Sequence, residues 1–425
     1  MGIVLFASFF ALIAMSVPIA IALGLSSVIA LSLFSHTSLM VIVQKVYGGA
    51  DSFTLMAIPF FILAGNVMSS GGVSRRLVDL AGSLLGRMTG GLAQVTTVAC
   101  TFFGSISGSA PATTAAIGSV MVKPMEEKGY DPAFAAAVAA SSGTIGLLIP
   151  PSITLVIYGV ITGTSIAKLF MGGVLPGLLM TAAIMAVNHI ICVRHGHRGG
   201  DAFSASAVAT SARRSFFALL MPVIILGGIY GGVFTPTEAA VVAVFYGLLV
   251  GLYIHRELKH GQIPGILLET GKSTAVIMFL IATAHIFSYI LASEQIPQKL
   301  TVAMLNISHD PHALLAMVVI SLMVVGTFLD NAVAVVLMTP IFYPLTIQAG
   351  IDPIFFGVLM ILTLAIGQIT PPVGLCLFVA CNITKVSIES LSLRVVPYVI
   401  ALLVVVACLV IFPDIVLFIP NSMDL

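Results

Sequence analysis

A run of hydroxyl-bearing residues interrupts one of the most apolar stretches of the chain. Residues 104–114 read Gly-Ser-Ile-Ser-Gly-Ser-Ala-Pro-Ala-Thr-Thr. The turn could bind a small cation through hydroxyl and carbonyl oxygens, or an anion through the free N–H groups of a helix that begins there. The alternative is close helix packing through small residues. The candidate hydroxyls belong to Ser105, Ser107, Ser109, Thr113 and Thr114.

An acidic residue stands inside a second apolar stretch. The segment Gly-Thr-Phe-Leu-Asp-Asn-Ala-Val, which begins at Gly326, contains Asp330 and Asn331. Asp330 is the only charged side chain that we expect near the middle of the membrane, where a carboxylate is costly and marks a candidate functional group. It could bind a cation, hydrogen-bond a substrate hydroxyl or cap the helix that follows, and these roles are compatible.

Two Pro-Pro pairs occur in similar contexts. The segments 143–152 (GTIGLLIPPS) and 366–374 (IGQITPPVG) lie within long apolar stretches. Each pair removes amide donors and strains the preceding turn, so a helix should break there rather than merely kink. The freed carbonyl groups could coordinate sodium, and the candidate positions are Gly143, Gly146, Gly367 and Thr370, with Ser152 just beyond the first break.

The composition shows what must position these groups. The 425 residues are 59% hydrophobic and only 8% charged, with a mean hydropathy of +1.17, whereas soluble domains carry about 25% charged residues. Alternating segments of about 10 residues, the mark of a membrane barrel, are absent. We therefore predict an all-α polytopic membrane protein with spanning helices near 3–33, 52–70, 132–165, 169–193, 216–233, 236–254, 265–292, 353–383 and 390–418.

Motifs for other chemistries are weak. The five cysteines lie in apolar runs and read as small buried hydrophobes, and no Cys-x-x-Cys pair or Cys/His cluster indicates a metal. The segment 265–274 resembles a phosphate-binding loop, but its two glycines are separated by five residues rather than four. We predict no nucleotide, haem or transition-metal cofactor and no nucleic-acid partner.

Two further pairs of apolar runs are too short or too broken to span. They are 92–104 with 112–126, and 312–328 with 332–348. We predict that each pair forms a re-entrant hairpin, with an irregular tip buried in protein at mid-depth. In the resulting topology, 14 of the 17 Lys and Arg residues fall on one side and three on the other. This positive-inside split predicts that the basic loops, and with them the N-terminus, are cytoplasmic.

The chain also contains an internal repeat. Residues 129–152 and 350–373 align without gaps and share Gly, Asp-Pro, Phe, Ile-Gly and Pro-Pro, while Gly104 and Gly326 begin corresponding segments upstream. The topology places the two halves in opposite orientations, which is typical of secondary transporters. We predict a first repeat at 1–193 (hairpin about 92–128, broken helix about 132–165), a basic cytoplasmic linker at 194–214, and a second repeat at 215–425 (hairpin about 312–348, broken helix about 353–383).

Taken together, the hydroxyl-rich tip, Phe328–Val333 and the two Pro-Pro breaks resemble the large membrane (M) subunit of tripartite ATP-independent periplasmic (TRAP) transporters. The likeness extends to 56–68 (MAIPFFILAGNVM) and 232–240 (GVFTPTEAA). It implies sodium-driven import of an organic acid, such as a sialic acid or a C4-dicarboxylate, through an elevator mechanism in the bacterial inner membrane. It also implies two partners, a periplasmic substrate-binding protein and a small membrane subunit of about four helices.

The resemblance and the motifs together define the predicted sites. Sodium would lie between each hairpin tip and the broken helix of the same half, at Ser105, Gly143, Gly146, Gly326, Asp330, Gly367 and Thr370. The substrate would contact Ser105, Ser107, Ser109, Ser152, Asp330 and Asn331. We predict no catalytic residue and no metal other than sodium.

Three alternatives remain open on the sequence. A stand-alone sodium/anion symporter of the same architecture would need no binding protein. An intramembrane enzyme would need a second acid or base at the depth of Asp330, and none is found. A channel would carry sodium without substrate, whereas the paired inverted tips favour alternating access.

Overall fold

A computed structural model describes residues 1–34, 40–197, 199 and 204–423, and these residues form helices and connecting turns without a strand. The longer helices are α1 Gly2–Ala14, α2 Ile19–Phe34, α3 Met40–Ala50, α4 Ala57–Ser70, α5 Val73–Leu85, α6 Gly91–Ser107, α7 Ala110–Glu127, α8 Pro132–Gly143, α9 Ile153–Thr162, α10 Ile166–Arg194, α11 Ala205–Tyr230, α12 Pro236–Leu249, α13 Ile263–Ser293, α14 Ile296–Leu305, α15 Pro311–Phe328, α16 Asn331–Gln348, α17 Pro353–Gly367, α18 Leu375–Thr384, α19 Ile388–Ile411 and α20 Asp414–Asn421. Short helical turns occupy Phe53–Met56, Thr144–Leu147, Val250–Ile254 and His260–Gln262.

Eight helical segments among the described residues are long and apolar enough to cross a membrane. They include the long helices α10, α11 and α13, and also both arms of the second predicted hairpin, α15 and α16. This confirms the prediction of a polytopic α-helical membrane protein. It also corrects one reason given for the second hairpin, because an 18-residue arm is about 27 Å long and is not too short to span.

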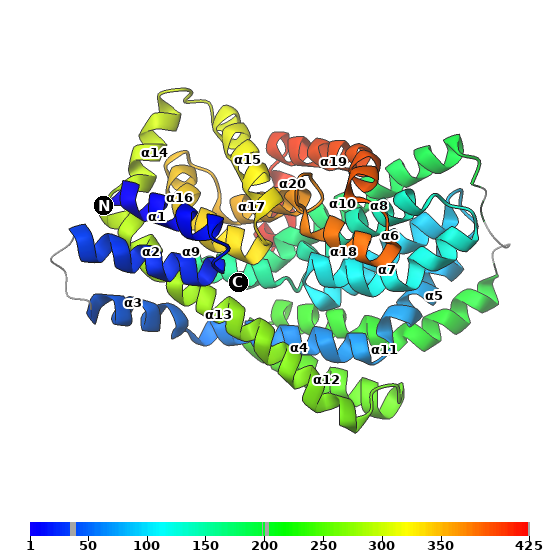
Figure 1. Cartoon of the computed structure of the whole chain (residues 1–425). Helices are drawn as coiled ribbons and strands as arrows, with labels where there is room; N and C mark the ends of the chain where they lie inside the picture. The colour runs from blue at the N-terminus through cyan, green and yellow to red at the C-terminus, as the bar shows by residue number, and fades with distance from the viewer. Residues whose placement is uncertain (35–39, 198, 200–203, 424–425) are drawn as a thin grey trace.

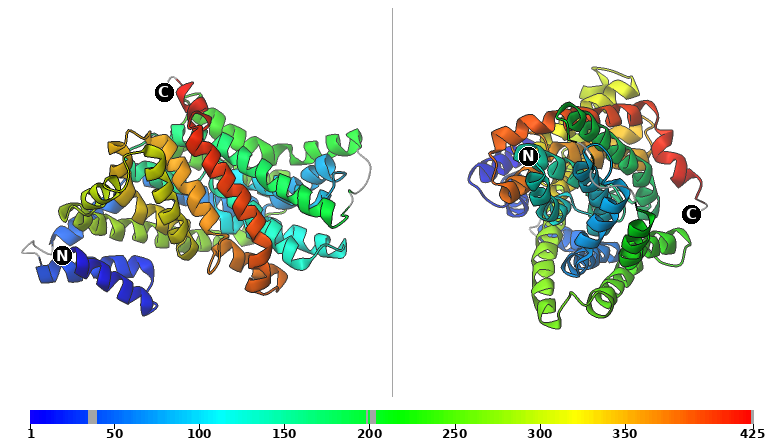
Figure 2. Two further views of the ribbon diagram at one scale, coloured as in Figure 1. Left: turned by 90° about the horizontal axis from the view of Figure 1, so that it is seen from above. Right: turned by 90° about the vertical axis from the view of Figure 1, so that its right-hand side faces the viewer.

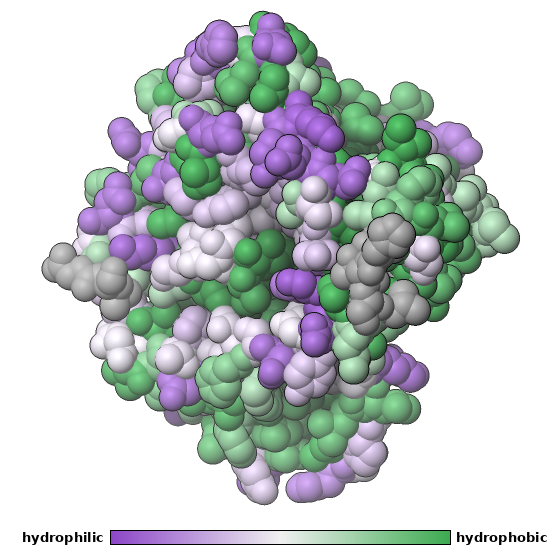
Figure 3. Space-filling model, turned by 90° about the vertical axis from the view of Figure 1, so that its left-hand side faces the viewer, coloured by the Kyte–Doolittle hydropathy of each residue, from purple (hydrophilic) through white to green (hydrophobic). Residues whose placement is uncertain are grey.

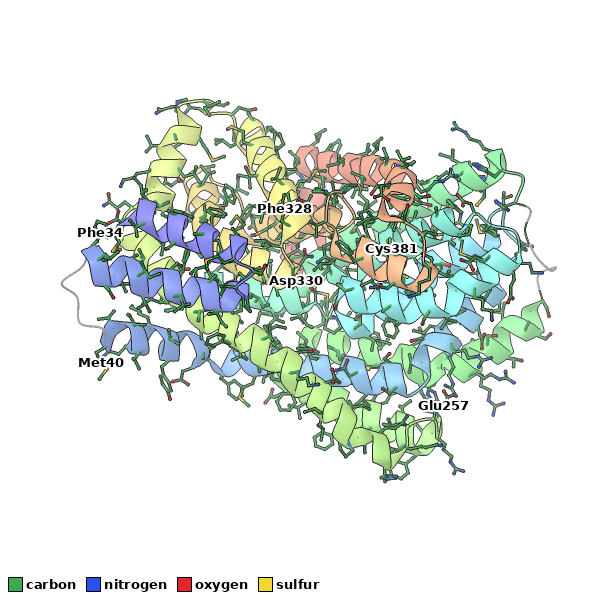
Figure 4. The ribbon with its side chains drawn as sticks, viewed as in Figure 1. Phe34, Met40, Glu257, Phe328, Asp330 and Cys381 are labelled. Carbon is green, nitrogen blue, oxygen red and sulfur yellow. The ribbon has the colours of Figure 1, made fainter. Side chains whose placement is uncertain are left out.

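The prediction of one spanning helix over residues 3–33 is wrong. The chain turns at residues 15–18, where Ser16 has a positive φ of 63° and Pro18 has no amide hydrogen to donate. The two resulting helices, α1 and α2, pack side by side, so that Met1 and Phe34 lie at the same end of the molecule (Figures 1 and 4). The predicted helix over 390–418 is likewise divided, because α19 ends at Ile411 and α20 begins after Pro413.

The two re-entrant hairpins extend from opposite ends of the molecule. The first, α6–α7, runs from the right of Figure 1 towards the centre, and the second, α15–α16, runs inward from the left. Figure 2 preserves this arrangement when the molecule is seen from above. Phe328 and Asp330, at the second tip, lie in the middle of the molecule (Figure 4). Two hairpins with opposed orientations are therefore present, and their re-entrant course in the membrane stays a prediction.

The broken helices repeat the same local design. Asp131 caps α8 by accepting a hydrogen bond from the amide of Ala133, and Asp352 caps α17 by accepting from Ile354. A proline follows each aspartate at the first helical position, where its missing amide hydrogen is not needed. Each helix then stops before its Pro-Pro pair, and the chain resumes in α9 or α18. The predicted breaks are present in both halves.

The two halves interlock around these breaks. The resumed helix α18 of the second half packs on α7 and α8 of the first, while α9 of the first half packs on α16 and α17. Helices α4 and α13 contact each other and lie along one side of this assembly (Figure 1). The linker prediction over 194–214 stays a prediction, because residues 198 and 200–203 fall outside the described part of the chain.

The end of the molecule that carries Met1 and Phe34 is here called the amino end (Figures 1 and 4). The other end, which carries Glu257 and its ion-pair partner Arg76, is called the basic end. Figure 3 views the amino end, where hydrophilic side chains gather around a hollow in the middle of the face. Hydrophobic side chains dominate its right and lower margins. A polar centre with an apolar margin suits a protein whose perimeter faces lipid.

Candidate functional site

The first hairpin rests on the break of its own repeat through two glycines. A Cβ atom placed on Gly104 would lie 2.6 Å from the Cα of Gly146. At the tip, Gly108 has a φ of 61°, and a Cβ atom there would lie 2.7 Å from the carbonyl oxygen of Pro151. Neither contact leaves room for a side chain, so glycine allows the hairpin backbone to touch the break.

Hydroxyl groups line this contact. Ser107 Oγ lies 2.7 Å from Thr113 Oγ1, and the Thr113 hydroxyl donates to the carbonyl oxygen of Ser109 at 2.8 Å. Thr113 Oγ1 also lies 2.5 Å from the point where a Cβ atom on Gly146 would stand. Because Ser107 and Thr113 are buried, these oxygens form a compact polar cluster inside an apolar protein. Clustered hydroxyl and carbonyl oxygens suit a small, hard cation.

The other predicted residues of this repeat vary in their placement. Ser152 is fully buried, and its hydroxyl donates to the carbonyl oxygen of Leu147. Gly143 faces Thr114, whose buried hydroxyl interacts with the thiol of Cys376 in the second repeat. Ser105 donates to a carbonyl oxygen one turn earlier in its own helix, at 2.7 Å. Ser152 and Gly143 thus lie at the break, whereas the Ser105 hydroxyl is engaged within α6.

The second hairpin makes the equivalent contact. A Cβ atom on Gly367 would lie 2.5 Å from the carbonyl carbon of Gly326 and 2.6 Å from its Cα. The amide of Gly374, beyond the break, donates to the carbonyl oxygen of Thr327 at 3.0 Å. Gly326 and Gly367 occupy the positions that the repeat alignment pairs with Gly104 and Gly146. Both predicted glycine pairs are therefore brought together.

Asp330 caps the helix that follows it. Its Oδ2 accepts a hydrogen bond from the amide of Ala332 at 3.0 Å, so the capping role left open by the sequence is confirmed. Thr370, another predicted ligand, donates to the carbonyl oxygen of Ile366 at 2.8 Å. Capping leaves the carboxylate able to accept further bonds, because an ionised carboxylate has about four acceptor positions.

Two buried amides at the second tip and break have polar atoms without a partner among the described residues. Asn331 is 1% exposed, and neither its Oδ1 nor its Nδ2 has a hydrogen-bond partner among the described residues. Gln368 is fully buried; its Oε1 accepts from the thiol of Cys376 at 3.3 Å, while its Nε2 has no partner in the same part of the chain. Unsatisfied buried amides are costly, so they indicate a bound water, ion or ligand. Gln368 is not among the site residues predicted from the sequence, although it stands beside the Pro-Pro break.

A cavity of about 270 Å³ separates the first tip from helices α4 and α13. Asn66, on its wall, donates to the Thr270 hydroxyl at 3.0 Å. The α4 and α13 residues on this wall are not among the predicted site residues, although polar residues inside apolar spans are a recognisable signal. None of the described residues on the wall is charged, and the wall includes Gly65, Asn66, Ser69, Ser107, Ser109 and Ser273.

Comparison with known proteins agrees with this architecture. Residues 6–415 match the family described as "Tripartite ATP-independent periplasmic transporter, DctM component". The chain is 41% identical over 399 residues to the C4-dicarboxylate TRAP transporter large permease protein DctM of Pseudomonas aeruginosa, covering 94% of this chain and 93% of that protein. It is 38% identical over 404 residues to the sialic acid large permease protein SiaM of Vibrio cholerae, covering 95% of each.

Two further relatives bear on length and fold. The isethionate TRAP transporter permease protein DctMQ of Oleidesulfovibrio alaskensis is 42% identical over 416 residues, which are 98% of this chain but only 66% of that protein. The solved structure of the Alcanivorax borkumensis YdaH transporter has a TM-score of 0.65 and 16% identity, covering 90% of this chain and 88% of that one. At this identity the likeness shows the fold alone.

These findings define a membrane permease of the tripartite class. The chain belongs to the DctM family, the large permease component of TRAP transporters. Its relatives are transporter permeases rather than enzymes. Membership implies a multi-pass protein of the bacterial inner membrane that works with a periplasmic binding protein and a small membrane subunit.

Proposed function

We propose that this chain is the membrane subunit through which an inward sodium gradient drives import of an organic acid delivered by a periplasmic binding protein. The observation that carries the proposal is the pair of equivalent contacts between hairpin and break, Gly104 with Gly146 and Gly326 with Gly367. Each places oxygen-bearing turns and interrupted helices at the centre of the molecule. Interrupted helices at mid-depth supply the carbonyl groups that bind coupling ions in secondary transporters.

The substrate would occupy the cavity beside the first tip. The N-terminal turn of α7 begins there after Ser109, so its free N–H groups and the helix dipole favour a carboxylate. Ser107, Asn66 and Ser273 add uncharged hydrogen-bonding groups. A site without a fixed cation holds an anion weakly, which suits a substrate that must be released. Asp330 and Asn331 would serve the second tip, in sodium binding or in contact with the substrate.

The substrate class follows from the relatives, whose names specify a C4-dicarboxylate, a sialic acid or isethionate. All three are small polar organic anions. We propose that this chain transports a carboxylate of the first two kinds, or a similar acid. The cavity wall is uncharged and combines hydrogen-bonding side chains with apolar ones, which fits an acid that also carries hydroxyl or carbonyl groups.

An elevator movement would carry this site across the membrane. The two hairpins and the broken helices would move together, because α18 packs on α7 and α8 while α9 packs on α16 and α17. Helices α4 and α13 would belong to the stationary scaffold. The cavity supports this division, since it lies along the boundary between the first tip and those two helices.

We propose an orientation that revises the sequence-based expectation for the N-terminus. The basic loops favour a cytoplasmic basic end. Because residues 3–33 are divided into α1 and α2, the amino end would then lie in the periplasm. Ile3 is 87% exposed, so an Ile3→Cys variant should be accessible. A membrane-impermeant maleimide applied to the outside of spheroplasts is expected to label it, as it labels Asn306→Cys, but not Lys128→Cys. Labelling of Ile3→Cys only after lysis would restore the cytoplasmic assignment.

Filling the cavity is expected to reduce uptake. Ile277 lines the cavity on α13, whereas its neighbour Val276 is 66% exposed and points away from it. An Ile277→Phe variant should lower initial uptake about tenfold or more, because the added ring occupies substrate volume and a misplaced substrate loses rate steeply. Val276→Phe, the matched control, should transport normally. Equal uptake by the two variants, at equal amounts of folded protein, would move the substrate elsewhere.

The test of the proposed function is uptake in proteoliposomes that contain this chain and its small membrane subunit. Labelled sialic acid and C4-dicarboxylates would be offered with and without the binding protein and an inward sodium gradient. Uptake that requires both supports the proposal. Sodium-dependent uptake without the binding protein would instead establish a stand-alone symporter, and sodium-independent flux would contradict sodium coupling.

A further inference from the structure

A second, strongly basic cavity lies away from the candidate site. It measures about 490 Å³ and is formed by α5, the first half of α11 and the segment after α12. Glu257 on its wall lies at the basic end of the molecule (Figure 4). Its charged lining residues are Arg75, Arg76, Arg213, Arg214, Asp79 and Glu257.

The charges of this basic cavity do not cancel. Arg76 pairs with Glu257 at 2.6 Å and also donates to the carbonyl oxygen of Gly72 at 3.0 Å. Within the described part of the chain, Arg75, Arg213 and Arg214 make no ion pair. Four arginines against two carboxylates leave a net charge of +2. Guanidinium groups form paired hydrogen bonds with phosphate oxygens, so this cavity fits a phosphate group.

His255 adds an unsatisfied polar atom to the same wall. Its Nδ1 lies 3.3 Å from the carbonyl oxygen of Gly71, and its buried Nε2 has no hydrogen-bond partner among the described residues. Burial, and then the charge of Arg76, lower the pKa of His255, so the imidazole is neutral at neutral pH. In the tautomer whose Nδ1 donates to Gly71, Nε2 is an acceptor. A hydroxyl group of the ligand would satisfy it.

Apolar side chains adjoin the basic cavity. Phe217 and Ile254 form part of its wall, and the neighbouring residues Phe216 and Tyr253 are 55% and 66% exposed. Phe216 and Tyr253 each lie on a helical segment that is long and apolar enough to cross the membrane. A soluble anion would gain nothing from this apolar flank, whereas the acyl chains of a lipid would continue along it.

We propose that the basic cavity binds the phosphate headgroup of an anionic phospholipid, with phosphatidylglycerol as the fitting class. The arginines hold the phosphate, and His255 Nε2 accepts a hydrogen bond from a headgroup hydroxyl. The acyl chains lie on the outer surfaces of α11 and α12. The lipid thereby joins α5, α11 and the segment after α12 at the basic end.

The test is lipid retention by the full-length chain in non-ionic detergent, followed by native mass spectrometry during titration with phosphatidylglycerol. The wild type is expected to retain one tightly bound phosphatidylglycerol in preference to phosphatidylcholine. Arg213→Gln/Arg214→Gln should weaken this binding roughly tenfold or more, because two charge-assisted contacts are lost. Arg213→Lys/Arg214→Lys, which keeps the charge, should retain a larger share of it.

Lys123→Gln/Lys128→Gln is the matched control, since it removes two exposed positive charges outside the cavity. Size-exclusion profiles establish that each variant is folded. Equal lipid binding by the wild type and Arg213→Gln/Arg214→Gln would overturn the proposal, as would an equal loss in the lysine control. Displacement of the lipid by equimolar inorganic phosphate would also overturn it and would identify a site for a soluble anion.

Discussion

A Gly367→Ala variant is expected to lose transport and to be less stable than the wild type. The new Cβ atom would lie 2.5 Å from the Gly326 carbonyl carbon and 2.6 Å from its Cα. Both atoms belong to the backbone, so no side chain can rotate away, and the second hairpin must separate from its broken helix. Overpacking of this kind costs about 1–3 kcal/mol in the free energy of unfolding.

The functional loss should exceed the loss of stability. Displacing the hairpin separates the tip from the break at the point where we propose that the coupling ion binds, and a shift of about 1 Å at such a site can reduce rate about 100-fold. Initial uptake in proteoliposomes and thermal unfolding in detergent measure the two effects. Gly104→Ala should lower uptake and stability in the same way, because its Cβ atom would lie 2.6 Å from the Cα of Gly146 in the first repeat.

Gly227→Ala is the matched control for both variants. Gly227 lies within α11, and a Cβ atom there would meet no other atom within 4 Å. Alanine favours a helix over glycine by up to about 1 kcal/mol, so this substitution should be neutral or slightly stabilising. Full uptake by Gly367→Ala, or a similar loss in Gly227→Ala, would contradict the role assigned to the glycine contacts.

An Asp330→Asn variant is expected to fold normally but to need a higher sodium concentration for uptake. Asparagine caps a helix about as well as aspartate, so the bond from the Ala332 amide to residue 330 can be retained. What is removed is the negative charge at the middle of the molecule. If that charge helps to hold the coupling ion, the sodium concentration for half-maximal uptake should rise at least about tenfold, equivalent to about 1.4 kcal/mol.

Asp330→Ala separates the two roles of this residue. Alanine removes both the charge and the cap, and loss of a cap costs about 0.5–2 kcal/mol. The unfolding temperature should therefore fall for Asp330→Ala and stay near the wild-type value for Asp330→Asn. Unchanged uptake and unchanged sodium dependence in Asp330→Asn would limit this aspartate to capping α16.

Local backbone chemistry explains why several features were predictable. Asp-Pro begins α8 and α17 because the aspartate caps the helix and proline tolerates the first position. The Pro-Pro pairs end helices wherever they occur, since proline has no amide hydrogen to donate. The repeat alignment also pairs Gly104 with Gly326, and each of them contacts the break of its own repeat. Such signals lie within a few residues of the feature they produce.

Other features depend on residues far apart in the chain. Pro18 alone is compatible with a kinked spanning helix, and only the packing of α1 on α2 shows that the chain reverses there. Asn66 on α4 and Ser273 on α13 line the same cavity as the first tip, although they lie far from it and from each other in the chain. No local pattern predicts which apolar helices will meet.

The sequence by itself determined that this chain is an α-helical membrane transporter with two inverted hairpins, broken helices and a mostly one-sided distribution of basic residues. Hydropathy, proline and capping chemistry act locally and can be read directly from it. The tertiary structure decided that α9 and α18 cross to the opposite repeat and that α4 and α13 form the other wall of the cavity. It also decided that the side-chain amide of Asn331 and the Nε2 atom of Gln368 have no hydrogen-bond partner among the described residues. Helices of similar apolarity are distinguished only by the fit of their surfaces, and that fit exists only once the chain is folded.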